Sequence, residues 1–166
     1  MIFLTVGTYP LPFDRLLIAV DDAIANGVIK EEVFAQVGLS SYRPRNMKYA
    51  QMLDKKTFDS HFQKASGIIG HAGMGTITMA LDHNKPLLAM PRLKKYGEIV
   101  SDHQISIARR FSELGHILVV YNAADLPEGI RRMKNFIPRK RETHPHAVAD
   151  RIRRFLDSLQ DLSRTE

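Results

Sequence analysis

The sequence predicts an α/β fold in which helices cover both faces of a doubly wound, mostly parallel, Rossmann-like sheet. Short apolar segments without a polar alternation recur along the chain, as expected of strands covered on both faces. Between them lie segments with apolar residues at helical spacing, and glycine or proline marks most of the changes. Strands that alternate with helices favour right-handed crossovers and a ligand site at the carboxyl ends of the strands.

Each element follows from this pattern. Strands are expected over residues 2–6, 33–38, 67–71, 86–91 and 117–121, with a short additional strand within 47–53. Helices are expected over residues 13–24, 57–65, 76–83, 102–114, 126–136 and 146–159. Gly27 and Gly115 are typical helix stops, and Pro127 suits a first helical turn.

The pattern also predicts the domain organisation. We expect one nucleotide-sugar-binding domain over residues 1–136, because a chain of 166 residues is long enough for a single core. Residues 137–166 form a basic, proline-containing connector and a terminal helix, which packs on the same domain or on a partner.

Composition excludes several classes of function. The chain has no cysteine, which excludes disulfides, thiolate catalysis and cysteine-based zinc sites and fits a cytoplasmic location. Its seven histidines lack metal-ligand spacing, so we expect no metal and no cofactor. No apolar run approaches the ~20 residues of a membrane span.

The net charge of +6 indicates anionic partners. Without aromatic stacking clusters, a specific nucleic-acid partner is not expected.

The glycine-rich segment from Gly70 to Thr76 is the strongest candidate site. An apolar strand ends there, glycines follow at the spacing G-x-x-G-x-G, and a helix begins. The first turn of a helix leaves N–H groups unpaired and carries partial positive charge, so it can bind a phosphate. The spacing differs from both the dinucleotide and the Walker patterns. The alternative, that the turn only packs a helix close to the sheet, remains open at this point.

Other polar residues follow strands at the same edge. His71 ends a strand, where its ring either binds a phosphate or hydrogen-bonds to the backbone. Asp102 is a helix-capping residue or part of the site, and Gln104 can offer one donor and one acceptor to a sugar. Arg92 and Glu98 lie in the loop before it, where they contact a ligand or only solvent.

The ordered set of these motifs resembles the donor-binding half of family 28 glycosyltransferases. The segments that carry the resemblance are Thr5–Thr8, Pro12–Leu16, Gly70–Thr76, Lys85–Leu87, Pro91–Arg92, Gly97–Glu98 and Asp102–Gln104. The chain is most similar to small subunits of two-subunit enzymes: PssE-type exopolysaccharide subunits, and the eukaryotic subunit that adds the second sugar on dolichol. This resemblance covers residues 1 to about 126.

The resemblance implies half of a two-domain GT-B enzyme, with the acceptor half on a separate, membrane-anchored protein. It implies an inverting, metal-independent transfer of a hexose or N-acetylhexosamine from a UDP-sugar to a lipid-linked acceptor. The residues expected to bind the diphosphate are Gly7, Thr8, His71, Ala72, Gly73, Gly75 and Thr76. Those expected to bind the sugar or nucleotide are Gly38, Arg92, Glu98, Asp102, His103 and Gln104. The catalytic base is unassigned and is expected on the partner.

One position departs from the family pattern. Many relatives have a glutamate eight residues after the motif histidine, where it accepts hydrogen bonds from the ribose hydroxyls. Met79 occupies that position here and cannot accept them, with Asp82 as a possible substitute.

Two hypotheses of different class therefore follow. The chain is a donor-binding enzyme subunit, recruited by its partner to the inner face of the membrane, or it is a non-catalytic nucleotide-sugar binding module. The terminal helix, whose apolar stripe lies beside Arg151, Arg153 and Arg154, packs on its own domain or contacts the partner or acidic lipid.

Overall fold

A six-stranded parallel sheet forms the centre of the protein, with the strand order β3-β2-β1-β4-β5-β6. The computed structural model describes residues 1–141 and 145–162. The strands are β1 (Ile2–Thr5), β2 (Val33–Gln36), β3 (Lys48–Ala50), β4 (Gly67–His71), β5 (Leu87–Met90) and β6 (Leu118–Val119). The helices are α1 (Asp14–Ala25), α2 (Lys55–Lys64), α3 (Met74–Asp82), α4 (His103–Glu113), α5 (Leu126–Met133) and α6 (Pro145–Leu162), with short 3-10 turns η1 (Lys94–Tyr96) and η2 (Ala123–Asp125). The predicted fold class is confirmed.

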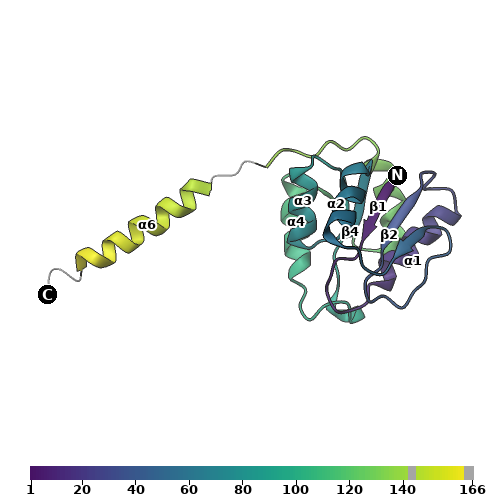
Figure 1. Cartoon of the computed structure of the whole chain (residues 1–166), viewed down its shortest axis with the longest axis horizontal. Helices are drawn as coiled ribbons and strands as arrows, with labels where there is room; N and C mark the ends of the chain where they lie inside the picture. The colour runs from purple at the N-terminus through teal and green to yellow at the C-terminus, as the bar shows by residue number, and fades with distance from the viewer. Residues whose placement is uncertain (142–144, 163–166) are drawn as a thin grey trace.

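Helices cover both faces of the sheet because alternate strand residues point to opposite faces. One core contains Leu4 and Ile69 of the strands and packs under α1 and α5. The other contains Phe3 and Ile68 and packs under α2, α3 and α4. Figure 1 shows α2, α3 and α4 side by side, with the sheet between them and α1.

The chain direction across the sheet reverses between β1 and β4. From β1 the chain proceeds to β2 and β3 on one side, and from β4 to β5 and β6 on the other. A crevice forms at such a switch point, beyond the carboxyl ends of the two strands. Here Thr5 of β1 is paired with Gly70 of β4, so the loops that begin near Gly7 and at His71 lie next to each other.

Several boundaries differ from the predicted ones. Helix α3 begins at Met74, two residues before the predicted start, so that Gly75 and Thr76 belong to its first turn. Helix α2 begins at Lys55 rather than 57, because Asp54 caps it by accepting a hydrogen bond from the N–H of Thr57. Strand β6 is only two residues long. The 3-10 turns η1 and η2 were not predicted.

Lys85, part of one of the family-like motifs, lies at the other end of the sheet. Its ammonium group donates to the carbonyls of Gln63 and Ala65, at 2.6 and 2.7 Å. These carbonyls belong to the C-terminal end of α2, where a cation is favourable. The motif therefore secures a helix end and takes no part in the cleft.

Helix α6 stands away from the α/β body in Figure 1. Its described side chains, residues 149–157, are exposed, including Ile152, Phe155 and Leu156. Part of the predicted connector, residues 142–144, lies outside the described residues. The division at residue 136 and the partner of this helix remain predictions.

Candidate functional site

A cleft of about 720 Å³ opens at the carboxyl ends of β1, β2 and β4. It is bounded by the loops after these strands and by the first turns of α2, α3 and α4. Its lining residues are Thr5, Gly7, Thr8, Tyr9, Pro10, Gln36, Met52, Leu53, Lys55, Phe58, His71, Gly73, Met74, Gly75, Thr76, Met79, Ile99, His103 and Gln104. The cleft therefore lies at the switch point of the sheet, where the sequence predicts the site.

Backbone N–H groups of α3 open into this cleft. Gly73 precedes the helix and supplies no side-chain cap, and the first N–H bonded within the helix is that of Ile77, to the carbonyl of Gly73. The N–H groups of residues 74–76 have no acceptor among the described residues. Three unpaired donors at the positive end of a helix can bind an anion.

The imidazole of His71 lies between two glycines. A Cβ atom at Gly7 would lie 2.4 Å from its Nε2, and a Cβ at Gly73 would lie 2.1 Å from its Cε1. Both positions must therefore lack a side chain for the ring to fit. Nε2 lies 3.1 Å from the hydroxyl of Thr76. Burial, together with the nearby positive charge of Arg92, lowers the pKa of His71 to about 4, so the ring is neutral near pH 7.

The structure brings most of the predicted site residues together. Eight of them line the cleft: Gly7, Thr8, His71, Gly73, Gly75, Thr76, His103 and Gln104. Ala72 is fully buried beneath the turn. The amide oxygen of Gln104 already accepts from the N–H of Arg92 at 3.1 Å. One of its two lone pairs is therefore engaged within the protein, and the amide nitrogen remains a donor on the cleft side.

Arg92 lies outside the cleft lining and is fully buried. Its guanidinium donates to the carbonyls of Val6, Leu11, Pro12 and Glu98, at 2.8 to 3.1 Å. It also packs over the ring of Phe13. Burial lowers the pKa of Arg92 to about 10, while Glu98 opposes that shift, so it stays charged near pH 7. The structure thus gives Arg92 a role in holding the loop after β1, in place of the predicted ligand contact.

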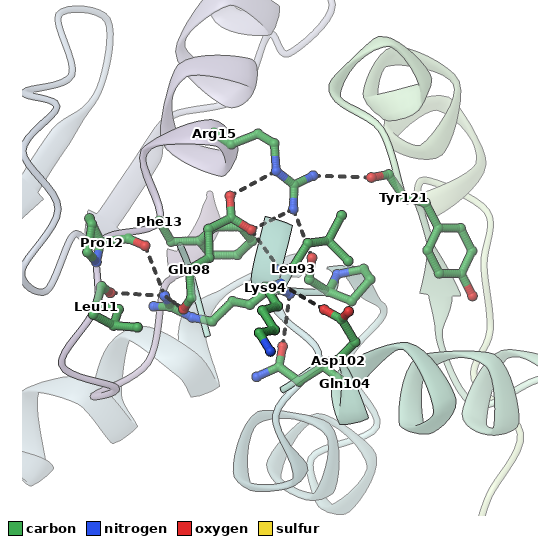
Figure 2. A network of polar contacts seen from close by, with 12 residues as sticks. Leu11, Pro12, Phe13, Arg15, Leu93, Lys94, Glu98, Asp102, Gln104 and Tyr121 are labelled. Carbon is green, nitrogen blue, oxygen red and sulfur yellow. Dashed lines mark hydrogen bonds and ion pairs between the residues drawn. The ribbon is translucent and has the colours of Figure 1, made fainter. Parts of the chain in front are cut away.

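Glu98 and Asp102 are likewise bonded to the protein. Figure 2 shows the carboxylate of Glu98 paired with Arg15, and Glu98 also accepts from the N–H of Leu93. Asp102 precedes α4 but does not cap it with its side chain, which accepts from the N–H of Lys94 at 2.7 Å. Neither residue lines the cleft, so direct ligand contact by them is not supported.

Gly38 also lies outside the lining, close to the loop after β1. Its φ of +56° favours glycine, and a Cβ there would lie 3.0 Å from the side chain of Val6. Gly38 therefore packs against the loop that contains Gly7 and does not contribute to the cleft surface.

Sequence reasoning missed most of the apolar side chains that line the cleft, which we call the apolar wall. Met52, Leu53 and Phe58 line the cleft beside Met79, and Gln36 at the end of β2 is buried against it. Their position in the sequence could have identified them. They follow β2 and β3, which are parallel to β1 and β4 and therefore end at the same edge of the sheet. Lys55 also lines the cleft, with its ammonium group 2.6 Å from Asp59.

The described residues contain no group of three or more His, Cys, Asp or Glu side chains placed to hold a metal ion. Within the same residues, no helix is both long and apolar enough to cross a membrane.

Comparisons with solved structures agree with this architecture. The chain aligns with the glycosyltransferase of kitacinnamycin at a TM-score of 0.61 and 14% identity, over 81% of this chain and 34% of that one. It aligns with MurG from Acinetobacter baumannii at a TM-score of 0.53 and 20% identity, over 79% and 39%. The solution structure of ALG13 gives a TM-score of 0.58 and 19% identity, over 88% and 91%. These likenesses support the GT-B half fold.

Sequence comparison identifies the family. The UDP-N-acetylglucosamine transferase subunit ALG13 of Candida glabrata is 35% identical over 80 residues, which are 46% of this chain and only 38% of that protein. The model of the glycosyltransferase family 28 C-terminal domain matches residues 1–159. The chain therefore belongs to the glycosyltransferase family 28 C-terminal domain family.

Proposed function

We propose that the chain is the donor-binding subunit of an inverting, metal-independent glycosyltransferase that uses a UDP-sugar. The observation that carries this proposal is the set of unpaired N–H groups of residues 74–76, which open into the cleft beside a neutral His71. The diphosphate would occupy this turn, and the sugar would extend toward His103 and Gln104 on α4.

The geometry supports a leaving-group role for the turn. In the transfer, the bond from the anomeric carbon to UDP breaks as the acceptor oxygen bonds to the opposite face of that carbon. UDP departs with the bonding electron pair. The positive end of the helix and the unpaired N–H groups would stabilise the negative charge that develops on it. Fixed dipoles of this kind supply the charge stabilisation that a metal ion would otherwise provide.

The acceptor hydroxyl must lose its proton to a base. None of the described residues that line the cleft is aspartate or glutamate. Two histidines line it: His71, whose contact with Thr76 and lowered pKa make it a weak base, and His103, which lies 3.0 Å from the hydroxyl of Ser101. The absence of a lining carboxylate supports a base on a partner chain, which we propose to be a membrane-anchored, acceptor-binding subunit. A lipid-linked acceptor and a cytoplasmic position at the inner membrane face belong to the same proposal.

The experiment that tests the proposal combines transfer and binding. The chain is purified alone and with its partner subunit, and transfer from UDP-hexoses and UDP-N-acetylhexosamines to a lipid-linked acceptor is measured. We expect transfer only from the pair and its loss in Thr76→Val. Thr78→Val is the matched control, because Thr78 lies on α3 outside the cleft lining. Binding of UDP-sugars without any transfer by the pair would favour the alternative, a non-catalytic nucleotide-sugar binding module.

Binding itself has a sensitive measurement. A ligand at about 100 times its dissociation constant adds roughly 2.7 kcal/mol to the free energy of unfolding. If UDP-sugars neither bind nor stabilise the chain even with its partner, the donor-site assignment is wrong.

Peripheral membrane contact through α6 is a separate part of the proposal. Ile152, Phe155 and Leu156 are exposed on this helix, and Arg151, Arg153 and Arg154 are exposed beside them. An amphipathic helix with cationic flanks can bind an anionic bilayer. Reversing the three arginine charges should reduce flotation of the protein with anionic liposomes, and unchanged flotation would contradict the contact.

A further inference from the structure

The amide of Gln104 lies between the backbone of Arg92 and the ring of His71. Gln104 is buried in the first turn of α4, with 5% of its surface exposed. One end of its amide is 3.1 Å from the backbone nitrogen of Arg92, a contact drawn in Figure 2. A backbone N–H can only donate, so the atom that faces it must be the amide oxygen. The amide nitrogen then faces His71, 3.4 Å from Nδ1.

This orientation selects one form of the histidine ring. An amide NH₂ group donates and cannot accept, so the hydrogen bond from Gln104 requires a lone pair on Nδ1 of His71. A neutral imidazole with an unprotonated Nδ1 carries its proton on Nε2. Nε2 lies 3.1 Å from Oγ1 of Thr76, to which it must then donate.

The direction of these bonds decides what Thr76 presents to the cleft. When its oxygen accepts from His71, the hydroxyl proton of Thr76 is released for another acceptor. In the opposite tautomer, Thr76 would donate to Nε2 and turn its lone pairs toward the cleft, where they would repel an anion. Thr76 lines the cleft in the first turn of α3, beside the unpaired N–H groups.

We infer that Gln104 is a positioning residue: it holds His71 in the Nε2–H tautomer and so makes the hydroxyl of Thr76 a donor to a phosphate oxygen. The order of donation is Arg92 N–H to Gln104, Gln104 to His71, His71 to Thr76, and Thr76 to the anion. The phosphate at the end of this order rests on the proposed function, whereas the tautomer is a property of the free protein.

The neutral state of the ring agrees with this order. Burial disfavours the charged form of the ring, and the positive charge of Arg92 disfavours it further, so both lower the pKa of His71. The ring occupies the space that a Cβ atom at Gly7 or Gly73 would fill.

Nitrogen NMR of the histidine ring in the ligand-free protein tests the inference. At pH 7 we expect the proton of His71 on Nε2, with Nδ1 unprotonated. In Gln104→Glu a carboxylate oxygen faces Nδ1, so the proton should move to Nδ1 or the ring should become doubly protonated. In Gln104→Met, which adds no charge, we expect a mixture of both tautomers. A proton on Nδ1 in the unaltered protein, or the same tautomer in all three proteins, would overturn the inference.

UDP affinity provides the second measurement. Gln104→Met and Thr76→Val should each weaken UDP binding, Thr76→Val at least tenfold. Their combination should weaken it little more than one alone, because both remove the same donated proton. Thr76→Ser should retain binding, since it keeps the hydroxyl. Full additivity of the two variants would overturn the link from Gln104 to Thr76. If the unaltered protein fails to bind UDP while the ring responds as expected, the proposed function fails and the tautomer assignment stands.

Discussion

Arg15 and Glu98 form a bidentate ion pair that joins α1 to the loop after β5. The Nε and Nη2 atoms of Arg15 are each 2.9 Å from a carboxylate oxygen, and the side chain of Glu98 is only 5% exposed. Glu98 also accepts from the N–H of Leu93, and Arg15 also donates to the carbonyls of Pro91 and Tyr121 (Figure 2). The pair fixes the loop that carries Ile99 and leads to α4, and so shapes one side of the cleft.

Removing this carboxylate should destabilise the fold strongly. Breaking a buried ion pair leaves an uncompensated charge, at a cost of about 3–5 kcal/mol. We expect Glu98→Ala to lower the free energy of unfolding by about 3 kcal/mol in denaturant titrations. Asp59→Ala is the control, because its partner Lys55 is exposed and such pairs contribute about 0–1 kcal/mol. Equal effects of the two variants would contradict the structural role of Glu98.

Gly75→Ala should separate ligand binding from folding. Gly75 is an exposed residue in the first turn of α3, and an added Cβ meets nothing within 4 Å. Since alanine favours a helix over glycine by about 1 kcal/mol, stability should be unchanged or slightly higher. A methyl group beside the unpaired N–H groups should nevertheless weaken UDP binding at least tenfold, as measured by calorimetry. Unchanged affinity would place the anion elsewhere.

Gly73→Ala provides the contrast to Gly75→Ala. Its Cβ would lie 2.1 Å from the ring of His71, so we expect loss of both stability and UDP binding. A stable Gly73→Ala variant that binds UDP normally would contradict the position assigned to the ring.

Met79→Glu should tighten UDP binding. Met79 lines the cleft at the position where many family members have a ribose-binding glutamate, and it lies near the apolar side chains of Met52, Leu53 and Phe58. A carboxylate at this position can accept hydrogen bonds from ribose hydroxyls, which a thioether accepts only weakly. Affinity should rise for UDP and much less for 2′-deoxy-UDP. A loss of UDP affinity would show that the ribose lies elsewhere.

Acid should destabilise the protein through His71. The folded-state pKa of about 4 lies below the ordinary value of 6.5, so the unfolded chain binds a proton first as the pH falls. Stability is therefore unaffected above about pH 7 and decreases between about pH 6.5 and pH 4. From pH 7.5 to pH 5 we expect a loss of about 2 kcal/mol relative to His71→Gln, measured by urea unfolding at each pH. Parallel pH profiles of the two proteins would contradict the buried neutral ring.

The fold was largely predictable because its signals are local. Apolar strands and helical periodicity occur in the same order as the observed elements. Because ligands bind at the carboxyl ends of parallel strands, the sequence also predicts His71 and Gly73 at the cleft. Arg92 and Glu98 were not predictable as buried residues. Their partners, the carbonyls of residues 6 to 12 and the side chain of Arg15, lie more than 70 positions away in sequence.

The apolar wall was missed for a related reason. Met52, Leu53 and Phe58 reach the cleft only because β3 and α2 follow β2 at the same edge of the sheet. Their residue types are those of any core, so composition alone gives no reason to place them at a ligand site. Gln104 was predicted to lie in the cleft, but the direction of its amide depends on the backbone of Arg92.

The central claim is that the turn from His71 to Thr76 binds the diphosphate of a sugar nucleotide. Titration of the nitrogen-15-labelled protein with UDP, followed by amide NMR, tests it most directly. The account predicts saturable shifts of the amides of residues 73–76, which in Gly75→Ala require at least tenfold more UDP. Shifts confined to the opposite end of the sheet, near Ser66 and Lys85, or no shift at UDP concentrations well above the millimolar range would contradict it.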